Sequence, residues 1–115
     1  MSGSPSHSSA AVTQAFEAIG NPVRRKILDL LVEGERPVVD IAAEFAMSRP
    51  AISQHLGILL AAGLVSQARQ GRENRYRLVP ENLKPVREWI AHYERFWDDH
   101  FTRLRAHLEK GSSHE

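Results

Sequence analysis

Apolar residues recur at steps of three and four along most of this chain, which is the spacing of helices that bury one face. Between residues 9 and 63 the pattern restarts several times, and we expect four consecutive helices there. The first predicted helix places Val12, Phe16 and Ile19 on one face and ends at Gly20.

The second predicted helix has clear signals at both ends. Asn21 is a suitable N-cap, and Pro22 suits the first helical position because its missing N–H needs no partner there. Gly34 is a typical residue just after a helix end. The expected apolar stripe consists of Val23, Ile27, Leu30 and Leu31.

The third and fourth predicted helices form a helix-turn-helix. Residues 36–46 read as a short helix whose inward positions are Val38, Ile41, Ala42 and Phe45. A tight turn at residues 46–48 follows, and Ser48 is a good N-cap for the next helix. That helix has a buried stripe of Ile52, Leu56 and Leu59, and Gly63 ends it. A short helix, a tight turn and a second helix make the motif.

After this motif the pattern changes to that of strands. Residues 64–70 and 75–79 read as two short strands, with a hairpin tip at residues 71–74. A long helical stretch then runs from Pro80 to about Lys110, with Pro85 tolerable only in its first turn. The predicted fold class is therefore mainly α: a winged helix-turn-helix with about five helices and a two-stranded β-hairpin wing.

Composition indicates one globular domain, with 42% hydrophobic and 25% charged residues in a chain of 115. We expect residues 9–110 to form the domain, including a C-terminal helix at about 81–110, between flexible tails at 1–8 and 111–115. The start of the chain does not resemble a signal peptide, and no apolar run is long enough for a membrane span, so we expect a cytoplasmic protein. The absence of cysteine excludes thiolate metal sites and cysteine nucleophiles.

Positive charge is concentrated in the middle third of the chain. Residues 47–79 contain five arginines and one glutamate, a net charge of +4, whereas residues 9–46 carry −2 and residues 80–111 are neutral. A basic segment that coincides with a helix-turn-helix and its wing favours contact with nucleic acid.

The exposed side of the fourth helix is small and polar. Arg49 lies in its first turn, and Ser53 and Gln54 face away from the apolar stripe. These side chain types read base edges in a major groove, and a helix start also suits phosphate. Ser48 and Pro50 complete the expected DNA-contacting segment. A merely solvated face would more often carry Glu and Lys, and residues 48–70 have neither.

The hairpin tip supplies further candidates for DNA contact. Arg72, Asn74 and Arg75 lie at or beside it, and arginine there reaches phosphate or the minor groove. The alternative is an edge hairpin that its charges keep soluble. The sequence leaves two roles equally open for His55: a DNA contact or a half-buried structural residue. For Tyr76, packing in the core or the wing is the favoured interpretation.

Three segments together resemble the ArsR-type winged-helix repressors: "AFEAIGNPVRRKILDLL", "VVDIAAEFAMSRPAISQHLGILLAAGLV" and "RQGRENRYRL". The resemblance runs from about Phe16 to Leu78. It implies a sequence-specific homodimeric repressor that binds an operator in double-stranded DNA, often its own promoter, and releases it on a signal. It also implies dimerisation through the first and last helices.

The last helix supports dimerisation independently, because it carries more aromatic area than a lone surface helix exposes. A two-fold partner would cover that area and would predict an inverted-repeat operator. The expected interface residues are Val12, Phe16, Ile19, Trp89, Tyr93, Phe96, Trp97, Phe101 and Leu104.

Metal sensing is an alternative that the residues favour less. Members of the family that sense metals commonly carry a Cys-x-Cys pair, and Pro37 and Val39 occupy the matching positions here. The remaining candidate ligands are in the last helix, where the histidines are about two turns apart, so one ion would need ligands from a second subunit. These candidates are His92, Asp98, His100 and His107.

Other classes of function have less support. No nucleophile motif or Gly-rich phosphate loop is present, so we do not expect an enzyme. A winged helix can also bind protein instead of DNA, and that alternative stays open. No cofactor is expected. An inducer is undetermined: a small molecule near Trp89, Tyr93 or Trp97, a metal, or none.

Overall fold

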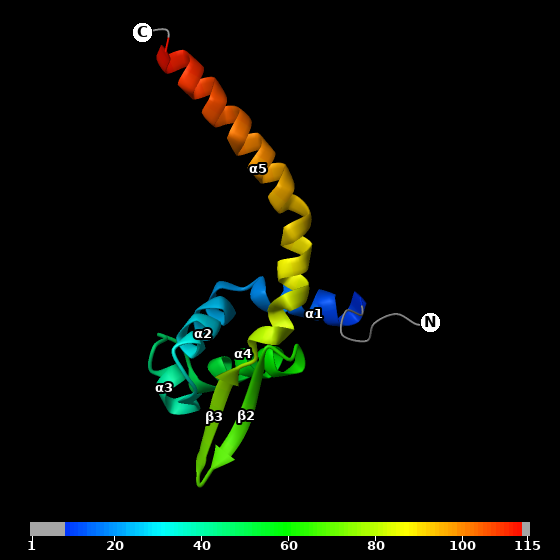
Figure 1. Ribbon diagram of the computed structural model, residues 1–115. Helices are drawn as coiled ribbons and strands as arrows, with labels where there is room; N and C mark the ends of the chain where they lie inside the picture. The colour runs from blue at the N-terminus through cyan, green and yellow to red at the C-terminus, as the bar shows by residue number, and fades with distance from the viewer. Residues whose placement is uncertain (1–8, 114–115) are drawn as a thin grey trace, which may run out of the picture. The chain divides into compact units, whose positions relative to one another are not determined.

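The structure is a computed structural model that describes residues 9–113 (Figure 1). The expected tail at residues 1–8 lies outside the described residues, as do residues 114 and 115. The chain divides into two compact units, with the boundary between Pro85 and Val86. None of the described helices combines the length and the apolarity that a membrane span needs.

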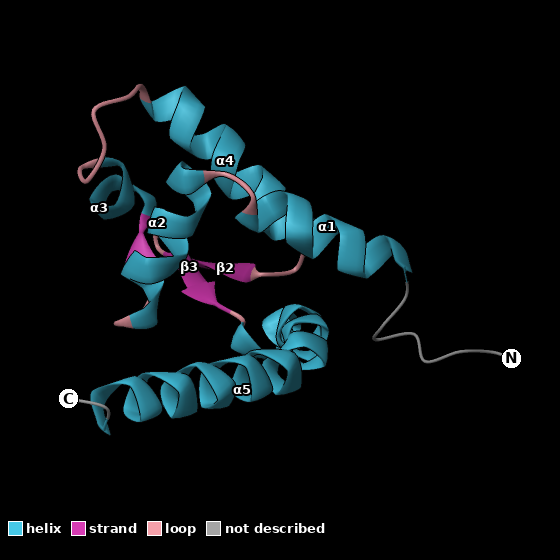
Figure 2. Cartoon of the chain, turned by 90° about the horizontal axis from the view of Figure 1, so that it is seen from above, coloured by secondary structure: helices cyan, strands magenta, loops and turns pink. Residues whose placement is uncertain are grey.

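The first unit is a winged helix-turn-helix, and its class agrees with the prediction. Its elements in chain order are α1 (Ser9–Ile19), α2 (Pro22–Val32), β1 (Arg36–Pro37), α3 (Val38–Ala42), α4 (Arg49–Ala61), β2 (Val65–Gln70), β3 (Glu73–Leu78) and the 3-10 helix η2 (Pro80–Leu83). Helix α4 packs against α1, α2, α3 and β2 (Figure 2). The second unit is the greater part of α5 (Lys84–Ser113).

Both predicted N-caps are confirmed. The side chain oxygen of Asn21 accepts hydrogen bonds from the backbone N–H groups of Val23 at 2.8 Å and Arg24 at 3.2 Å. Ser48 Oγ accepts one from the N–H of Ala51 at 3.3 Å. Because a helix start leaves N–H groups without intrahelical acceptors, these caps determine where α2 and α4 begin.

The core lies between α2, α3, α4 and the base of the wing. The predicted stripe of α4 is fully buried, and Leu64 and Ile41 join it. In α2 the most buried positions are Ile27, Leu28 and Leu31, whereas Val23 and Leu30 of the predicted stripe are half-buried. Each fully buried aliphatic side chain contributes about 1.5–3 kcal/mol relative to its exposed state.

Helix α1 turns two alanines toward the core and leaves its larger apolar residues partly exposed. Ala15 and Ala18 are buried, whereas Val12, Phe16 and Ile19 are only half-buried. Small side chains let the backbone of α1 approach α2 and α4 closely, so the larger residues are displaced to the rim of the contact.

Residues 36 and 37 form a short strand instead of the predicted start of the third helix. Arg36 pairs with Tyr76 and Pro37 with Arg75, which makes a three-stranded antiparallel sheet in the order β1-β3-β2. A residue before proline favours extended backbone, and proline is tolerated on an edge strand because it has no N–H to donate. Helix α3 therefore begins only at Val38.

The wing is a hairpin with a shorter tip than predicted. Gln70 pairs with Glu73, which leaves Gly71 and Arg72 as a two-residue loop. Gly71 has φ of +62°, and no other residue type in the described chain has positive φ. A glycine at the first loop position is the preference of a type II′ turn. Asn74, expected in the tip, lies in β3 opposite Arg69.

The segment after the wing begins with η2 before α5 starts at Lys84, so Pro85 falls in the first turn of α5 as expected. The side chain amide of Asn82 donates a 2.7 Å hydrogen bond to the carbonyl of Gly63, where α4 has just ended. Helix α5 continues past the expected end at Lys110 to Ser113.

Candidate nucleic-acid interface

One side of α4 is free of contacts with the core. Arg49, Pro50, Ser53 and Gln54 are all exposed, as predicted from their spacing, while the opposite stripe is fully buried. The exposed side thus offers a guanidinium, a hydroxyl and a side chain amide in the first half of the helix. These groups donate and accept the hydrogen bonds that base edges require.

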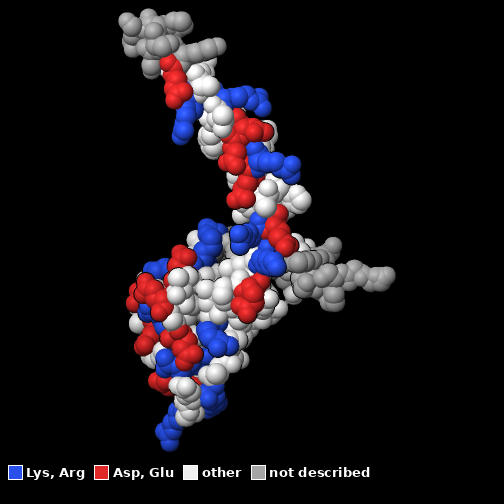
Figure 3. All heavy atoms as spheres, in the orientation of Figure 1, with Lys and Arg blue, Asp and Glu red and all other residues white. Residues whose placement is uncertain are grey.

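The start of α4 and the tip of the wing line a common hollow of about 180 Å³, together with the start of α3. Arg49 comes from α4, and Arg72 and Asn74 come from the wing, so the structure brings together candidates that are more than twenty residues apart in sequence. Figure 3 shows basic side chains at the far end of the wing. The remaining lining residues are Pro37, Val38, Val39 and Glu73.

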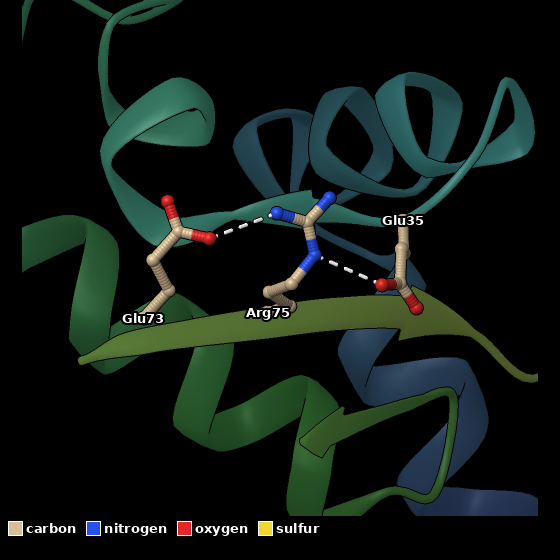
Figure 4. Close-up of polar contacts among 3 residues, drawn as sticks. All are labelled: Glu35, Glu73 and Arg75. Carbon is tan, nitrogen blue, oxygen red and sulfur yellow. Dashed lines mark hydrogen bonds and ion pairs between the residues drawn. The ribbon is translucent and has the colours of Figure 1, made fainter. Parts of the chain in front are cut away.

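The two wing arginines that were predicted to contact DNA have different surroundings: Arg72 lies in the loop, and Arg75 lies within β3 opposite Ala68. Arg72 is exposed and forms no ion pair within the described residues. Arg75 is half-buried, with Nε donating to Glu35 at 2.9 Å and Nη1 donating to Glu73 at 3.0 Å (Figure 4). Both hydrogen bonds raise the pKa of Arg75 above its ordinary value, and the one to Glu35 has the larger effect.

His55 lies at the side of α4, half-buried, and faces α2. Its Nδ1 is 3.2 Å from Nη1 of Arg24. A guanidinium has only donors, so Nδ1 accepts this hydrogen bond and the ring proton is on Nε2. The sequence left His55 open between two roles, and this contact supports the structural one.

The basic run at residues 24–26 contacts backbone carbonyls, a role that its sequence does not indicate. Arg24 donates to the carbonyls of Ala18 at 2.8 Å and Glu17 at 3.1 Å. Arg25 donates to the carbonyl of Ile19, and Lys26 to that of Glu44. Cations beside the last carbonyls of α1 also suit the negative end of its dipole.

Helix α5 carries an unusually apolar exposed surface. Trp89 and Tyr93 have ring centroids 5.0 Å apart, and Tyr93 and Trp97 are 6.2 Å apart. Phe96 remains 65% exposed and Phe101 62% exposed in the single chain. Such an area is larger than isolated surface residues account for and is typical of a protein interface.

The histidines of α5 do not converge within one chain. In the described residues, no group of three His, Cys, Asp or Glu side chains could hold a metal ion. His92, Asp98, His100 and His107 therefore provide no complete site in a single subunit. His100 instead lies against Phe96 and Phe101, with centroids 6.3 and 5.9 Å away.

Comparison with known proteins places this geometry in a family. Residues 21–67 match the family described as "Bacterial regulatory protein, arsR family". The chain is 40% identical over 82 residues to the transcriptional repressor SdpR of Bacillus subtilis (strain 168). The aligned residues make up 71% of this chain and 91% of SdpR.

Two crystal structures are also similar to this chain. A possible transcriptional regulator for arsenical resistance is 43% identical, with a TM-score of 0.64 over 81% of this chain and 94% of that one. An ArsR family transcriptional regulator is 26% identical, with a TM-score of 0.71 over 85% and 97% of the two chains. SdpR and the ArsR family regulator act on transcription, and the matched family is one of transcriptional regulators and not of enzymes. The chain belongs to the ArsR family of DNA-binding transcriptional regulators.

Proposed function

We propose that this protein is a homodimeric, sequence-specific repressor. It binds an inverted-repeat operator, and the promoter of its own gene is the first candidate for that operator. Each subunit inserts α4 into a major groove and places the β2–β3 wing along the neighbouring backbone. The single observation that best supports this proposal is the hollow shared by Arg49, Arg72 and Asn74. It places a helix start and a wing tip where one stretch of duplex can contact both.

The roles within this interface follow from the chemistry of each group. Ser53 and Gln54 read base edges, because a hydroxyl and an amide both donate and accept hydrogen bonds. Arg49 and Arg72 contact phosphate or groove edges as free cations. Ser48 and Pro50 position the first turn of α4. Because Pro50 has no N–H and the N–H of Ala51 donates to Ser48, the first-turn backbone donor left for phosphate is the N–H of Arg49.

Dimerisation uses the half-buried residues of α1 and the aromatic surface of α5. Val12, Phe16 and Ile19 lie at the rim of the α1 contact, and a second subunit would remove them from water together with the exposed rings. A two-fold dimer predicts two half-sites separated by about one helical turn, roughly 34 Å, or a multiple of it. The proposed location is the cytoplasm, where the operator would be accessible.

The test is a fluorescence-anisotropy titration with the duplex upstream of the protein's own gene and a scrambled duplex of equal length. We expect tight binding to the native duplex alone at near-physiological salt. Equal and strongly salt-dependent binding to both duplexes would mean that the protein binds DNA only non-specifically, through its basic surface. Binding to neither would support the alternative of a protein-interaction module.

A further inference from the structure

Glu35, Glu73 and Arg75 form a cluster that joins the wing to a segment forty residues earlier in the chain (Figure 4). We call it the Arg75 cluster. Glu35 lies directly before β1, and Glu73 is the first residue of β3. Two different nitrogen atoms of Arg75 donate to these two carboxylates, at 2.9 and 3.0 Å. The contact with Glu35 therefore adds a side chain link between the wing and the segment before β1, beside the backbone pairing of β1 with β3.

The strand register explains why these three side chains meet. Pro37 pairs with Arg75 and Arg36 with Tyr76, so Glu35 lies one step beyond β1 and diagonal to Arg75. Successive side chains on a strand alternate between faces, so Glu73 and Arg75 share one face of β3 and Tyr76 points to the other. Diagonal neighbours on one face are within reach of long side chains.

The electrostatics of the cluster differ from those of the other basic residues nearby. One guanidinium and two carboxylates carry a net charge of −1, so the cluster as a whole does not attract a polyanion. Arg49 and Arg72, in contrast, form no ion pair within the described part of the chain. Two of the five N–H donors of Arg75 are already used, and two carboxylates offset its charge, which makes Arg75 a weaker direct contact for phosphate than Arg49 or Arg72.

From this geometry we propose that Arg75 is a positioning residue for DNA binding: it fixes the wing against the segment before β1 and so aims Arg72 and Asn74. This inference rests on the proposed function. It assigns a role to Glu35, an acidic residue whose position beside a DNA-binding wing has no electrostatic advantage.

The first test is whether E35Q raises or lowers the affinity for the operator. Removing a negative charge beside a DNA-binding surface raises affinity when only long-range electrostatics act. If Glu35 positions the wing, E35Q instead lowers operator affinity, by about three- to ten-fold. The matched control is D40N, which removes one charge from an exposed residue of α3 that has no ion pair in the described chain. D40N should leave affinity unchanged or slightly raised. Equal or tighter binding by E35Q would overturn the proposal.

The second test compares salt dependence in R75Q and R72Q. A residue that contacts phosphate contributes about one to the slope of log affinity against log salt. We expect R72Q to lose that contribution and R75Q to retain the wild-type slope while binding more weakly. The double variant E35Q/R75Q should bind no more weakly than R75Q alone, because both changes remove the same ion pair. A reduced slope for R75Q would make it a direct contact and contradict the proposal.

A third measurement needs no DNA and separates this inference from the proposed function. Amide hydrogen exchange in β3 of the free protein should be faster in E35Q than in the wild type and D40N, because the ion pair that supports the β1–β3 pairing is lost. Unchanged exchange would refute the positioning role even if the protein binds its operator. Faster exchange in a protein that binds no operator would refute the proposed function and leave the structural role of the cluster intact.

Discussion

Arg24 of α2 contacts His55 of α4, with Nη1 3.2 Å from Nδ1. The same guanidinium donates to the carbonyls of Ala18 and Glu17, the first of which is buried. One side chain thus connects the end of α1, the start of α2 and the side of the proposed recognition helix. The side chain of Arg24 therefore contacts both α1, part of the proposed dimer interface, and α4, the proposed recognition helix.

We expect Arg24→Ala to lower the free energy of unfolding by about 1–3 kcal/mol, because it leaves several acceptors without their donor. Arg25→Ala is the control, since Arg25 is exposed and contributes one hydrogen bond, to Ile19. Urea denaturation of both variants measures the difference. Equal losses for the two variants would mean that the contact with His55 has no stabilising effect.

Gln54 and Arg72 should affect DNA binding in different ways. Gln54→Ala should cost about 1–3 kcal/mol on the native operator and relax discrimination at one or two base pairs, because a base-edge contact is lost. Arg72→Ala should weaken binding to all sequences by a similar factor. Titrations against a set of single-base operator variants distinguish these results. A uniform loss with Gln54→Ala would place that residue on the backbone of the DNA.

Phe96→Glu should convert the dimer into monomers and weaken operator binding. The charge would replace a ring that is 65% exposed in one chain, so the fold of the first unit should be unaffected while a desolvated interface would not tolerate it. Thr102→Glu makes the same kind of change on the opposite side of α5 and should remain dimeric. Sedimentation velocity and far-UV circular dichroism give the two readouts. A dimeric Phe96→Glu variant would exclude this surface as the interface.

Local signals made much of α4, the proposed recognition helix, predictable. Ser48 and Asn21 carry capping side chains, and the steps between Ile52, Leu56 and Leu59 specify one buried face. Such features depend on residues within one or two turns of each other, so a single sequence contains them. The exposure of Arg49 and Gln54 followed from the same periodicity.

The features that were missed depend on partners far away in the chain. Strand β1 has only two residues and exists because β3 pairs with it. The roles of Arg24 and Arg75 are set by His55 and Glu35, thirty-one and forty positions distant. In α1, Ala15 and Ala18 are the buried positions, and their burial depends on the neighbouring helices α2 and α4, so the spacing of the larger apolar residues did not indicate it.

Tyr76 gives the fold a dependence on alkaline pH. Its side chain is 8% exposed, and burial raises its pKa above the ordinary value of 10.0. The neutral phenol is favoured in the folded state, so the unfolded chain loses its proton first as pH rises. The resulting stabilisation is complete below about pH 10 and is lost as pH rises through the pKa of the folded state.

Tyr76→Phe should retain the packing and remove this part of the pH dependence. Urea denaturation of the wild type and the variant between pH 8 and pH 11, with Tyr93→Phe as the control for an exposed tyrosine, tests it. Above about pH 10, we expect the free energy of unfolding of the wild type to fall relative to that of Tyr76→Phe. A constant gap across that range would mean that the phenol is ionised as easily in the folded wing as in the unfolded chain.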